Sequence, residues 1–562
     1  MKRRSLLILP SIVLLLASCG NKDATSGLMI PKDAAMVVHI NSSSLASKLS
    51  WQEITQTTWF KMMHEDVPAD DTVANQLLAD PASSGIDTKA DMLLYVKKQG
   101  SHNYMIFSGS LTDAAAFEKL CTKVHSQSNV KKDGDFSYLD LRDKAAIVWN
   151  QSHFAYAGNA PDAPMGRSKT MDGHALNNGG SERGFGVDSL RMFGMNALSL
   201  KGSDNLNDDR FTSLIKDGSD VQIWVSSGHQ VAGLINTQVA MAKTDIFENN
   251  YTALSVNFDN GKITARAKKY FNDEMDKIMS NNRPQNISAD VINRIPSSNV
   301  AAVLAFNYSP KALREILAAT GLDLFADMAL AKAGFRVDDI VNANKGEVLV
   351  ALTDPSSVKK TDTTRSKKSV TISPSTKADI NILFATSVND TAAFQKMVSM
   401  GLNLLKQKMG DEAGNADVPK SLPWVNYKLQ NNWFAVSNTA AFRDKFLAGG
   451  NSNVPFAGKI TGHPVGLYID LQKLSQWMGV FGSTGTENIF QDITGQGGDY
   501  KNKATAFDFE INFTDKTTNS LKQLNQYFDK VSVLHNENRK KMKEAKIKDI
   551  EVKDPPPEVK EK

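Results

Sequence analysis

The chain contains 562 residues, of which 41% are hydrophobic and 22% are charged, and this balance supports a sizeable folded core and excludes wholesale disorder. Its length corresponds to roughly three to four domains of average size, or to two larger ones. The formal net charge is +4 and falls to +1 without the first 18 residues. This composition argues against a nucleic-acid-binding protein, which needs a clustered basic face.

The N-terminal segment 1–18 is typical of an export signal. Three basic residues, Lys2 to Arg4, precede an apolar stretch from Leu6 to Leu16. This stretch is far shorter than the roughly 20 residues that a membrane-spanning helix needs, so we expect no permanent transmembrane anchor here.

A short motif ends this segment, and its residues are Leu16, Ala17, Ser18 and Cys19. A branched apolar residue, two small residues and a cysteine in this order resemble the lipobox of bacterial lipoproteins. The resemblance implies cleavage between Ser18 and Cys19, attachment of a diacylglycerol to the Cys19 sulfur, and acylation of the new amino group. An ordinary secretory signal with a chance cysteine near its cleavage site is the alternative.

Residues 19–27 are then expected to form a polar tether after the lipidated cysteine, at most about 28 Å long from Gly20 to Gly27 when fully extended. A glycine at position 20 resembles lipoproteins that are sent on to the outer membrane. We therefore expect a cell-envelope protein of a Gram-negative bacterium, lipid-anchored to the outer membrane on its periplasmic face or at the cell surface.

The remaining chain contains an internal repeat. Residues 104–120 and 381–397 align without a gap, and seven of 17 positions are identical. Four further pairs of segments keep the same order along the two halves: 30–41 with 295–307, 150–158 with 430–438, 217–226 with 461–470, and 252–258 with 505–511. This pattern predicts a tandem duplication of two similar domains, with the first copy over 28–283 and the second over 290–534.

Each copy combines strands and helices. Alternating apolar residues predict strands at 36–40, 92–96, 105–107, 145–149 and 154–157 in the first copy and at 348–352, 380–385 and 433–436 in the second. An apolar stripe at helical spacing runs from Phe117 to Val124. Short turns at 150–152 and 430–432 favour antiparallel pairing. We therefore expect an α+β fold in which each copy has a mainly antiparallel sheet with helices packed on one face.

Four segments are expected to lie outside this pattern. The Gly-rich insertion 159–200 is too irregular for a packed element, and the Ser-, Thr- and Lys-rich segment 353–378 predicts a flexible surface loop. Residues 535–562 form a charged, Pro-containing tail, which first extends a helix and then ends it at its prolines. The Gly-rich run 494–500 lacks the lysine of a phosphate-binding loop and predicts a turn.

The beginning of the folded body also resembles a known family. The lipobox and tether are followed by Ile30 and Pro31, by an apolar strand that ends at Asn41, and by the sequence SSSLASKL at 42–49. This arrangement resembles an uncharacterised family of large, lipobox-bearing envelope lipoproteins from Bacteroidetes, classed as a domain of unknown function. The resemblance implies a location and a fold, and it brings no catalytic residues to this chain.

Catalytic and metal-binding patterns are absent from the sequence. Cys121 lies on the apolar helical stripe and aligns with Val398, which predicts an inert core thiol. Asp113 and Asp390 stand at equivalent predicted helix starts, where helix capping explains them better than an acid–base pair. Nine scattered histidines lack zinc-binding spacing, so we expect no metal site and no cofactor.

Three functions remain open, and the absence of a catalytic motif favours the first. It is a non-catalytic binding, adaptor or structural lipoprotein, held to a membrane by its N-terminal lipid, with an envelope protein or a ligand in a groove between the two copies. The second is a lipid-tethered hydrolase of envelope or host polymers, with an acid–base pair drawn from distant parts of the chain. The third is a surface partner of an outer-membrane nutrient transporter.

Overall fold

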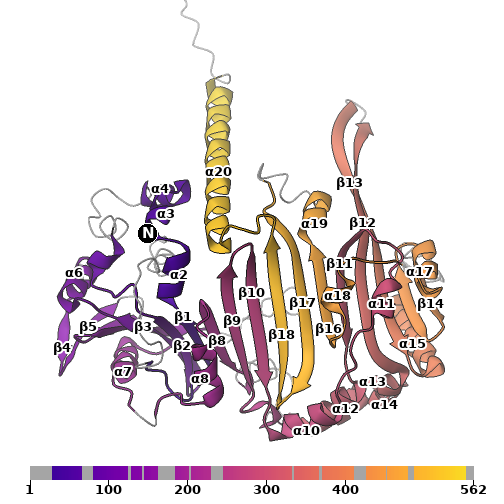
Figure 1. Ribbon diagram of the computed structural model, residues 1–562, viewed down its shortest axis with the longest axis horizontal. Helices are drawn as coiled ribbons and strands as arrows, with labels where there is room; N and C mark the ends of the chain where they lie inside the picture. The colour runs from indigo at the N-terminus through magenta and orange to yellow at the C-terminus, as the bar shows by residue number, and fades with distance from the viewer. Residues whose placement is uncertain are drawn as a thin grey trace, which may run out of the picture.

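The computed structural model describes residues 28–65, 80–124, 128–141, 145–161, 184–201, 204–228, 243, 245–331, 334–365, 370–409, 426–450, 452–478 and 487–551. Within these residues, 18 strands form one sheet, and helices lie against it (Figure 1). Neighbouring strands run antiparallel at both ends and at the centre of this sheet. The expected α+β class with an antiparallel sheet is therefore confirmed.

The first half of the sheet has the order β4–β5–β6–β7–β3–β2–β1–β8–β9–β10. Its strands are β1 Met36–Ile40, β2 Met92–Gln99, β3 His102–Ser110, β4 Lys131–Asp133, β5 Phe136–Leu141, β6 Ala145–Trp149, β7 His153–Ala160, β8 Val221–Ser226, β9 Tyr251–Asp259 and β10 Lys262–Tyr270. Chain neighbours such as β2 and β3 are joined by short turns, so they pair as hairpins.

The second half has the order β14–β15–β13–β12–β11–β16–β17–β18. Its strands are β11 Val300–Asn307, β12 Asn344–Arg365, β13 Val370–Val388, β14 Asn426–Gln430, β15 Trp433–Ser437, β16 Val465–Asp470, β17 Phe490–Lys501 and β18 Ala504–Phe513. β10 and β18 pair with each other from Lys262–Asn512 to Tyr270–Ala504. The two halves are therefore joined edge to edge into one continuous sheet.

The strand order is the same in both halves. Seven neighbouring strands of each half correspond by their place in the pairing order. In the first half they are β7, β3, β2, β1, β8, β9 and β10, and their counterparts, in the same order, are β15, β13, β12, β11, β16, β17 and β18. One expected equivalence is wrong, because 252–258 lies in β9, whose counterpart is β17, whereas 505–511 lies in β18, the counterpart of β10. Neighbouring strands here share the same alternation of apolar residues, so the pattern does not separate them. The duplication itself stays a prediction.

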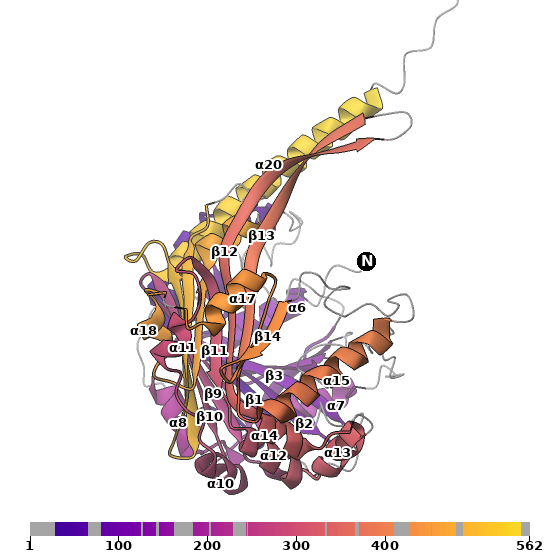
Figure 2. The ribbon, with the colours of Figure 1, turned by 90° about the vertical axis from the view of Figure 1, so that its right-hand side faces the viewer.

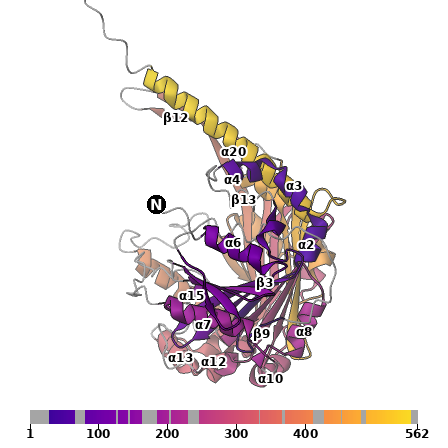
Figure 3. The same cartoon turned by 90° about the vertical axis from the view of Figure 1, so that its left-hand side faces the viewer.

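Helices lie on both faces of the sheet, not on one face as expected. In Figures 1 and 3, α6 lies above the first-half strands and α7 below them, and in Figure 2, α11 and α18 lie on one side of the second half and α15 on the other. The helices named below are α2 Ser42–Lys48, α3 Trp51–Thr55, α4 Thr58–Glu65, α6 Ala114–Val124, α7 Val187–Leu198, α8 Asp209–Lys216, α10 Asp273–Asn281, α11 Ala289–Asn293, α12 Pro310–Ala319, α13 Asp323–Ala331, α14 Val337–Ala343, α15 Thr391–Met409, α17 Ala440–Leu447, α18 Ala457–Ile460, α19 Leu471–Met478 and α20 Ser520–Glu551.

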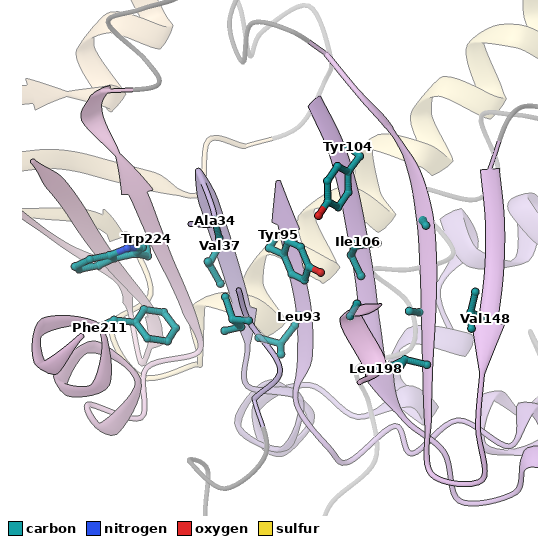
Figure 4. Packing of buried hydrophobic residues seen from close by; sticks show 14 of the residues in the cluster. Ala34, Val37, Leu93, Tyr95, Tyr104, Ile106, Val148, Leu198, Phe211 and Trp224 are labelled. Carbon is teal, nitrogen blue, oxygen red and sulfur yellow. The ribbon is translucent and has the colours of Figure 1, made fainter. Parts of the chain in front are cut away.

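The main cores lie on corresponding faces of the two halves. In the first half, Val37, Tyr95, Ile106 and Trp224 pack beneath α7 and α8 (Figure 4). In the second half, the corresponding face packs against α11, α17 and α18. Smaller clusters lie on the opposite face, one under α6 and one under α14 and α15. Helices therefore cover the two ends of this opposite face.

Part of the Gly-rich insertion 159–200 is a packed helix, contrary to expectation. α7 lies within this insertion, and its residue Leu190 is fully buried. Gly194 is needed where the helix meets the sheet, because an added Cβ would come within 2.8 Å of a methyl group of Val148. Glycine content alone did not reveal this close approach. Residues 162–183 of the insertion lie outside the described residues.

The segment 353–378 is not a loop. β12 and β13 continue through it as a ladder from Ser356–Asp379 to Arg365–Val370. Its threonines and valines are β-branched and favour strands, although its serines and lysines suggested a loop. Residues 366–369 lie outside the described residues.

The run 494–500 forms part of β17 and not a turn. Gly495 lies opposite Phe509, and an added Cβ would come within 2.7 Å of the phenyl ring. Glycine is therefore used here to let an aromatic ring lie over the strand. The expected helix before the C-terminal tail is confirmed, because α20 runs through residue 535 to Glu551.

Candidate functional site

The predicted anchor lies outside the described residues. This applies to the signal segment 1–18, to the lipobox residues Leu16, Ala17, Ser18 and Cys19, and to the tether 19–27. In the part of the chain that the structure describes, no helix is both long and apolar enough to cross a membrane. Lipid attachment at Cys19 therefore stays a prediction.

Cys121 is buried, as its place on the apolar stripe predicts. Its side chain is 4% exposed and packs in a cluster with Phe117 and Trp149. Burial, with a smaller effect from the nearby Glu118, raises the pKa of the thiol to about 12. Because a thiol is nucleophilic as its thiolate, Cys121 is unsuited to catalysis.

Asp113 and Asp390 cap equivalent helices. Asp113 Oδ1 accepts the backbone N–H groups of the second and third residues after it, at 2.9 and 3.0 Å, before α6. Asp390 Oδ1 makes the same two bonds, again at 2.9 and 3.0 Å, before α15. These bonds satisfy helix N–H groups that have no partner within the helix, which explains both residues without catalysis.

His39 belongs to a buried polar network. Its ring is 1% exposed, with Nδ1 at 2.6 Å from Gln222 Oε1 and Nε2 at 2.9 Å from Asp91 Oδ2. At the equivalent strand positions the second half has Ala305 and Gly466. The described residues contain no group of three or more His, Cys, Asp or Glu that could hold a metal ion. The two hydrogen bonds hold the His39 ring within the interior of the first half.

The two halves are joined by the β10–β18 ladder, and the groove expected between the two copies stays a prediction. Two open cavities lie elsewhere. One, of about 350 Å³, lies between α3 and α20 and is lined by residues that include Glu53, Lys522 and Asp529. The other, of about 540 Å³, lies beside the C-terminal end of α17. Neither cavity is at the seam between β10 and β18.

The face that carries α6 and α15 has a continuous apolar surface between those helices. The central row of cross-strand neighbours is Val256, Ala265, Phe509, Gly495, Leu467, Leu304, Val350 and Phe384. A second row is Phe258, Ile263, Ile511, Ile493, Ile469, Ala302, Leu352 and Ile382. A third is Leu254, Ala267, Phe507, Gly497, Val465, Phe306, Val348 and Thr386. We call these three rows the apolar floor.

The apolar floor arises from the alternation of residues along each strand. Successive side chains of a strand point to opposite faces, so Ile263 of β10 belongs to the floor while its neighbour Lys262 faces away. On that opposite face, Lys262 pairs with Glu510 at 2.7 Å and Arg266 with Asp508 at 3.4 Å, both in solvent. The floor itself contains no charged residue. It is therefore suited to an apolar partner and not to a charged one.

Much of the floor is accessible to solvent. Leu304 and Phe384 are each 38% exposed and Ile382 is 46% exposed. Most other side chains of the central and second rows are half-buried. On the opposite face of the same strands, Val303 and Leu383 are 1% exposed or less. None of the floor positions belongs to the five buried clusters of the described residues. In the third row Val348 and Thr386 are buried, and α19 lies close to β11, β12, β13, β16 and β17.

Sequence reasoning missed this surface, although a signal was present. The alternation in β10 and β18, KITARAKKY and ATAFDFEINF, marks one apolar face on each strand. An alternating strand normally turns its apolar face toward a core. Neither segment alone predicts that the two strands pair with each other, or that their shared apolar face stays open.

Comparisons with curated proteins and with solved structures add little to this description of the fold and the floor. No curated protein matches the chain. Among solved structures, crystal form I of TP0453 is similar with a TM-score of 0.23 and 10% identity, over 49% of this chain and 87% of that one. Crystal form III of TP0453 gives a TM-score of 0.25 and 8% identity, over 48% and 90%. Likenesses this small support no inference about this chain.

One family comparison is informative. Residues 27–161 match a domain of unknown function, DUF4836. The matched segment runs from the start of the body through β1, β2 and β3 to the end of β7. This agrees with the coarser part of the resemblance found in the sequence, namely an uncharacterised family. The chain is thus similar to DUF4836 over a segment that lies in the first half of its sheet.

Proposed function

We propose that this chain is a lipid-anchored cell-envelope protein that acts without catalysis, by binding an apolar partner on the apolar floor. The observation that carries the proposal is the floor itself, where Leu304, Ile382 and Phe384 are the most exposed members of a continuous uncharged surface. Contiguous exposed apolar surface on a folded protein marks an interaction site. Burying it against a partner contributes about 25 cal/mol per Å² of apolar area.

The location is part of this proposal. The basic start, the short apolar stretch, the two small residues and Cys19 together support a lipoprotein signal. Gly20 supports onward transport to the outer membrane, and the match to a domain of unknown function fits the expected Bacteroidetes lipoprotein family. The same strand order in both halves supports a tandem duplication, with the floor as the surface that the two copies share.

The binding proposal is tested with an apolar fluorescent probe, anilinonaphthalene sulfonate, on the full chain. We expect the double variant Leu304→Ser/Phe384→Ser to lose most of the probe's fluorescence enhancement. A matched variant, Leu324→Ser/Met328→Ser, removes side chains that are 69% and 59% exposed on α13, a helix that contributes no residue to the floor. It should retain the enhancement. Equal losses in the two variants would show that the floor is not the binding surface.

The anchoring proposal is tested separately by Cys19→Ala. We expect this variant to leave the membrane fraction, whereas the unaltered chain stays there and carries acyl groups on an N-terminal cysteine, as measured by mass spectrometry. Continued fractionation of Cys19→Ala with membranes would contradict the lipobox assignment.

A further inference from the structure

The β12–β13 hairpin extends far beyond the rest of the sheet. β11 pairs with β12 as far as Thr353, and β15 pairs with β13 between Leu383 and Ser387. Past these points, 357–365 and 370–378 pair only with each other among the described strands, over about 30 Å. We call these two segments the distal hairpin.

The helix α20 extends from the body in a similar way. Near its start, Lys522 pairs with Glu53 of α3 at 2.7 Å, and Asp529 accepts a hydrogen bond from the backbone N–H of Thr58. Beyond Asp529 the helix continues to Glu551, a length of about 33 Å. We call 530–551 the distal helix. Its reach is close to that of the distal hairpin.

The two extensions point the same way. They rise from the same end of the body in Figure 1, and in Figures 2 and 3 they lean toward the same side. The distal hairpin belongs to the second half of the sheet, whereas α20 follows the central strand β18. The tips of the two extensions are therefore two separate places at the same end of the molecule.

Both extensions are basic. The distal hairpin contains Lys359, Lys360, Arg365 and Lys377 against Asp362, a net charge of +3. The distal helix contains seven basic and four acidic residues, again a net charge of +3. The whole chain carries only +4, so the rest of the molecule is net negative. Positive charge is thus concentrated on the two parts that extend farthest.

We propose that the distal hairpin and the distal helix together contact an anionic lipid bilayer. Two separate basic extensions of similar reach and direction fit an extended charged surface, whereas a small anion would meet only one of them. Each lysine or arginine near an anionic bilayer strengthens binding about fivefold. The contact would hold the apolar floor at a fixed height and orientation.

Vesicle flotation of the full chain tests this contact. Vesicles of phosphatidylcholine are compared with vesicles in which about a third of the lipid is phosphatidylglycerol, at low and at high salt. The unaltered chain should prefer the anionic vesicles, and salt at about 0.5 M should remove this preference. The variants Lys359→Gln/Lys360→Gln/Arg365→Gln and Arg539→Gln/Lys543→Gln/Lys546→Gln should each reduce it by about tenfold or more.

A matched variant removes three exposed lysines from α8, α12 and α18, as Lys216→Gln/Lys311→Gln/Lys459→Gln. It should keep the preference, and circular dichroism should show all variants folded. The proposal is overturned if the extension variants keep the full preference, or if the matched variant loses as much. Loss of double-stranded DNA binding with unchanged vesicle binding would instead assign the extensions to nucleic acid. Because lipidation and probe binding are measured separately, failure of the proposed function would not produce these results.

Discussion

Phe107 on β3 and Phe384 on β13 occupy equivalent places in the repeat, yet Phe107 is 7% exposed and Phe384 is 38% exposed. In the first half, α6 covers this face, and Phe117 belongs to the same buried cluster as Phe107. In the second half, α15 packs through Phe394 near the end of β13, and Phe384 is left at the edge of the apolar floor. A repeated strand thus determines which residues share a face, whereas the segments between strands determine whether that face is covered.

The halves also differ in buried polarity. Asp220 of the first half is fully buried and accepts hydrogen bonds at 2.6 Å from Lys48, from Ser44 and from the backbone of Phe258. By the alignment of the repeats, its counterpart is Pro464, which has no polar side chain. The first half therefore holds a buried polar network at a position where the second half has a proline.

The largest expected difference concerns the two phenylalanines. Phe107→Ala should lower the free energy of unfolding by about 3–5 kcal/mol, because it leaves a cavity in a packed cluster. Phe384→Ala should lower it by less than about 1 kcal/mol, because its side chain is already in contact with water. Urea denaturation of both variants measures this. Similar losses in the two would mean that the floor is as tightly packed as the core beneath α6.

The buried carboxylate gives the next largest effect. Asp220→Ala should lower the free energy of unfolding by about 2–3 kcal/mol, since it leaves Lys48 and two further donors without their acceptor. Lys48 is partly exposed, which limits the loss. The exposed pair His463–Asp499 in the second half provides the control. Asp499→Ala should change stability by less than about 1 kcal/mol, and an equal effect would refute the contrast between the halves.

The helix caps should instead behave alike. Asp113→Ala and Asp390→Ala should each lower the free energy of unfolding by about 1 kcal/mol, because each removes the acceptor of two backbone N–H groups. The corresponding asparagine variants keep an acceptor oxygen and should lose less. If one aspartate proved essential to a binding or catalytic activity while the other did not, capping would not be its main role.

The smallest effect concerns the link between α3 and α20. Burial alone would raise the pKa of Glu53, but hydrogen bonds from Lys522 and Ser50 outweigh it and lower this pKa. Since the pKa is lower in the folded than in the unfolded chain, ionised Glu53 stabilises the fold above its unfolded pKa, and this is lost as the pH falls through the folded value. The unaltered chain should exceed Glu53→Gln in stability by less than about 1 kcal/mol at neutral pH, because the pair is largely exposed.

Thermal unfolding of both proteins as a function of pH measures this difference. It should shrink on acidification, and a difference that stayed constant with pH would show that the ion pair is not its source.

Much of the fold was predictable where the signal is local. The strands 36–40 and 145–149 appear as β1 and β6 with the bounds that alternation predicts. The capping roles of Asp113 and Asp390 were predictable because a cap depends on neighbours two and three residues away. The buried state of Cys121 followed from helical spacing. Each of these depends on interactions within a few residues of the chain.

The errors occurred where composition was used in place of packing. Segment 353–378 contains the residues of a loop by count, yet its β-branched residues pair across a hairpin. Gly495 appeared to belong to a turn, yet it lies in β17 beneath the ring of Phe509. Gly194 likewise lies in a helix, where it allows close contact with Val148. In each case the deciding neighbour is on another element.

The sequence by itself determined the alternation of apolar and polar residues on β10 and β18, and hence that each strand has one apolar and one charged face. It also determined the similarity of 104–120 to 381–397, the helix caps and the concentration of charge in the two extensions. Only the tertiary structure decided that β10 pairs with β18, and that the shared apolar face lies open between α6 and α15. The physical reason is that side-chain direction is set residue by residue along a strand, whereas burial depends on which distant segments come to lie against it.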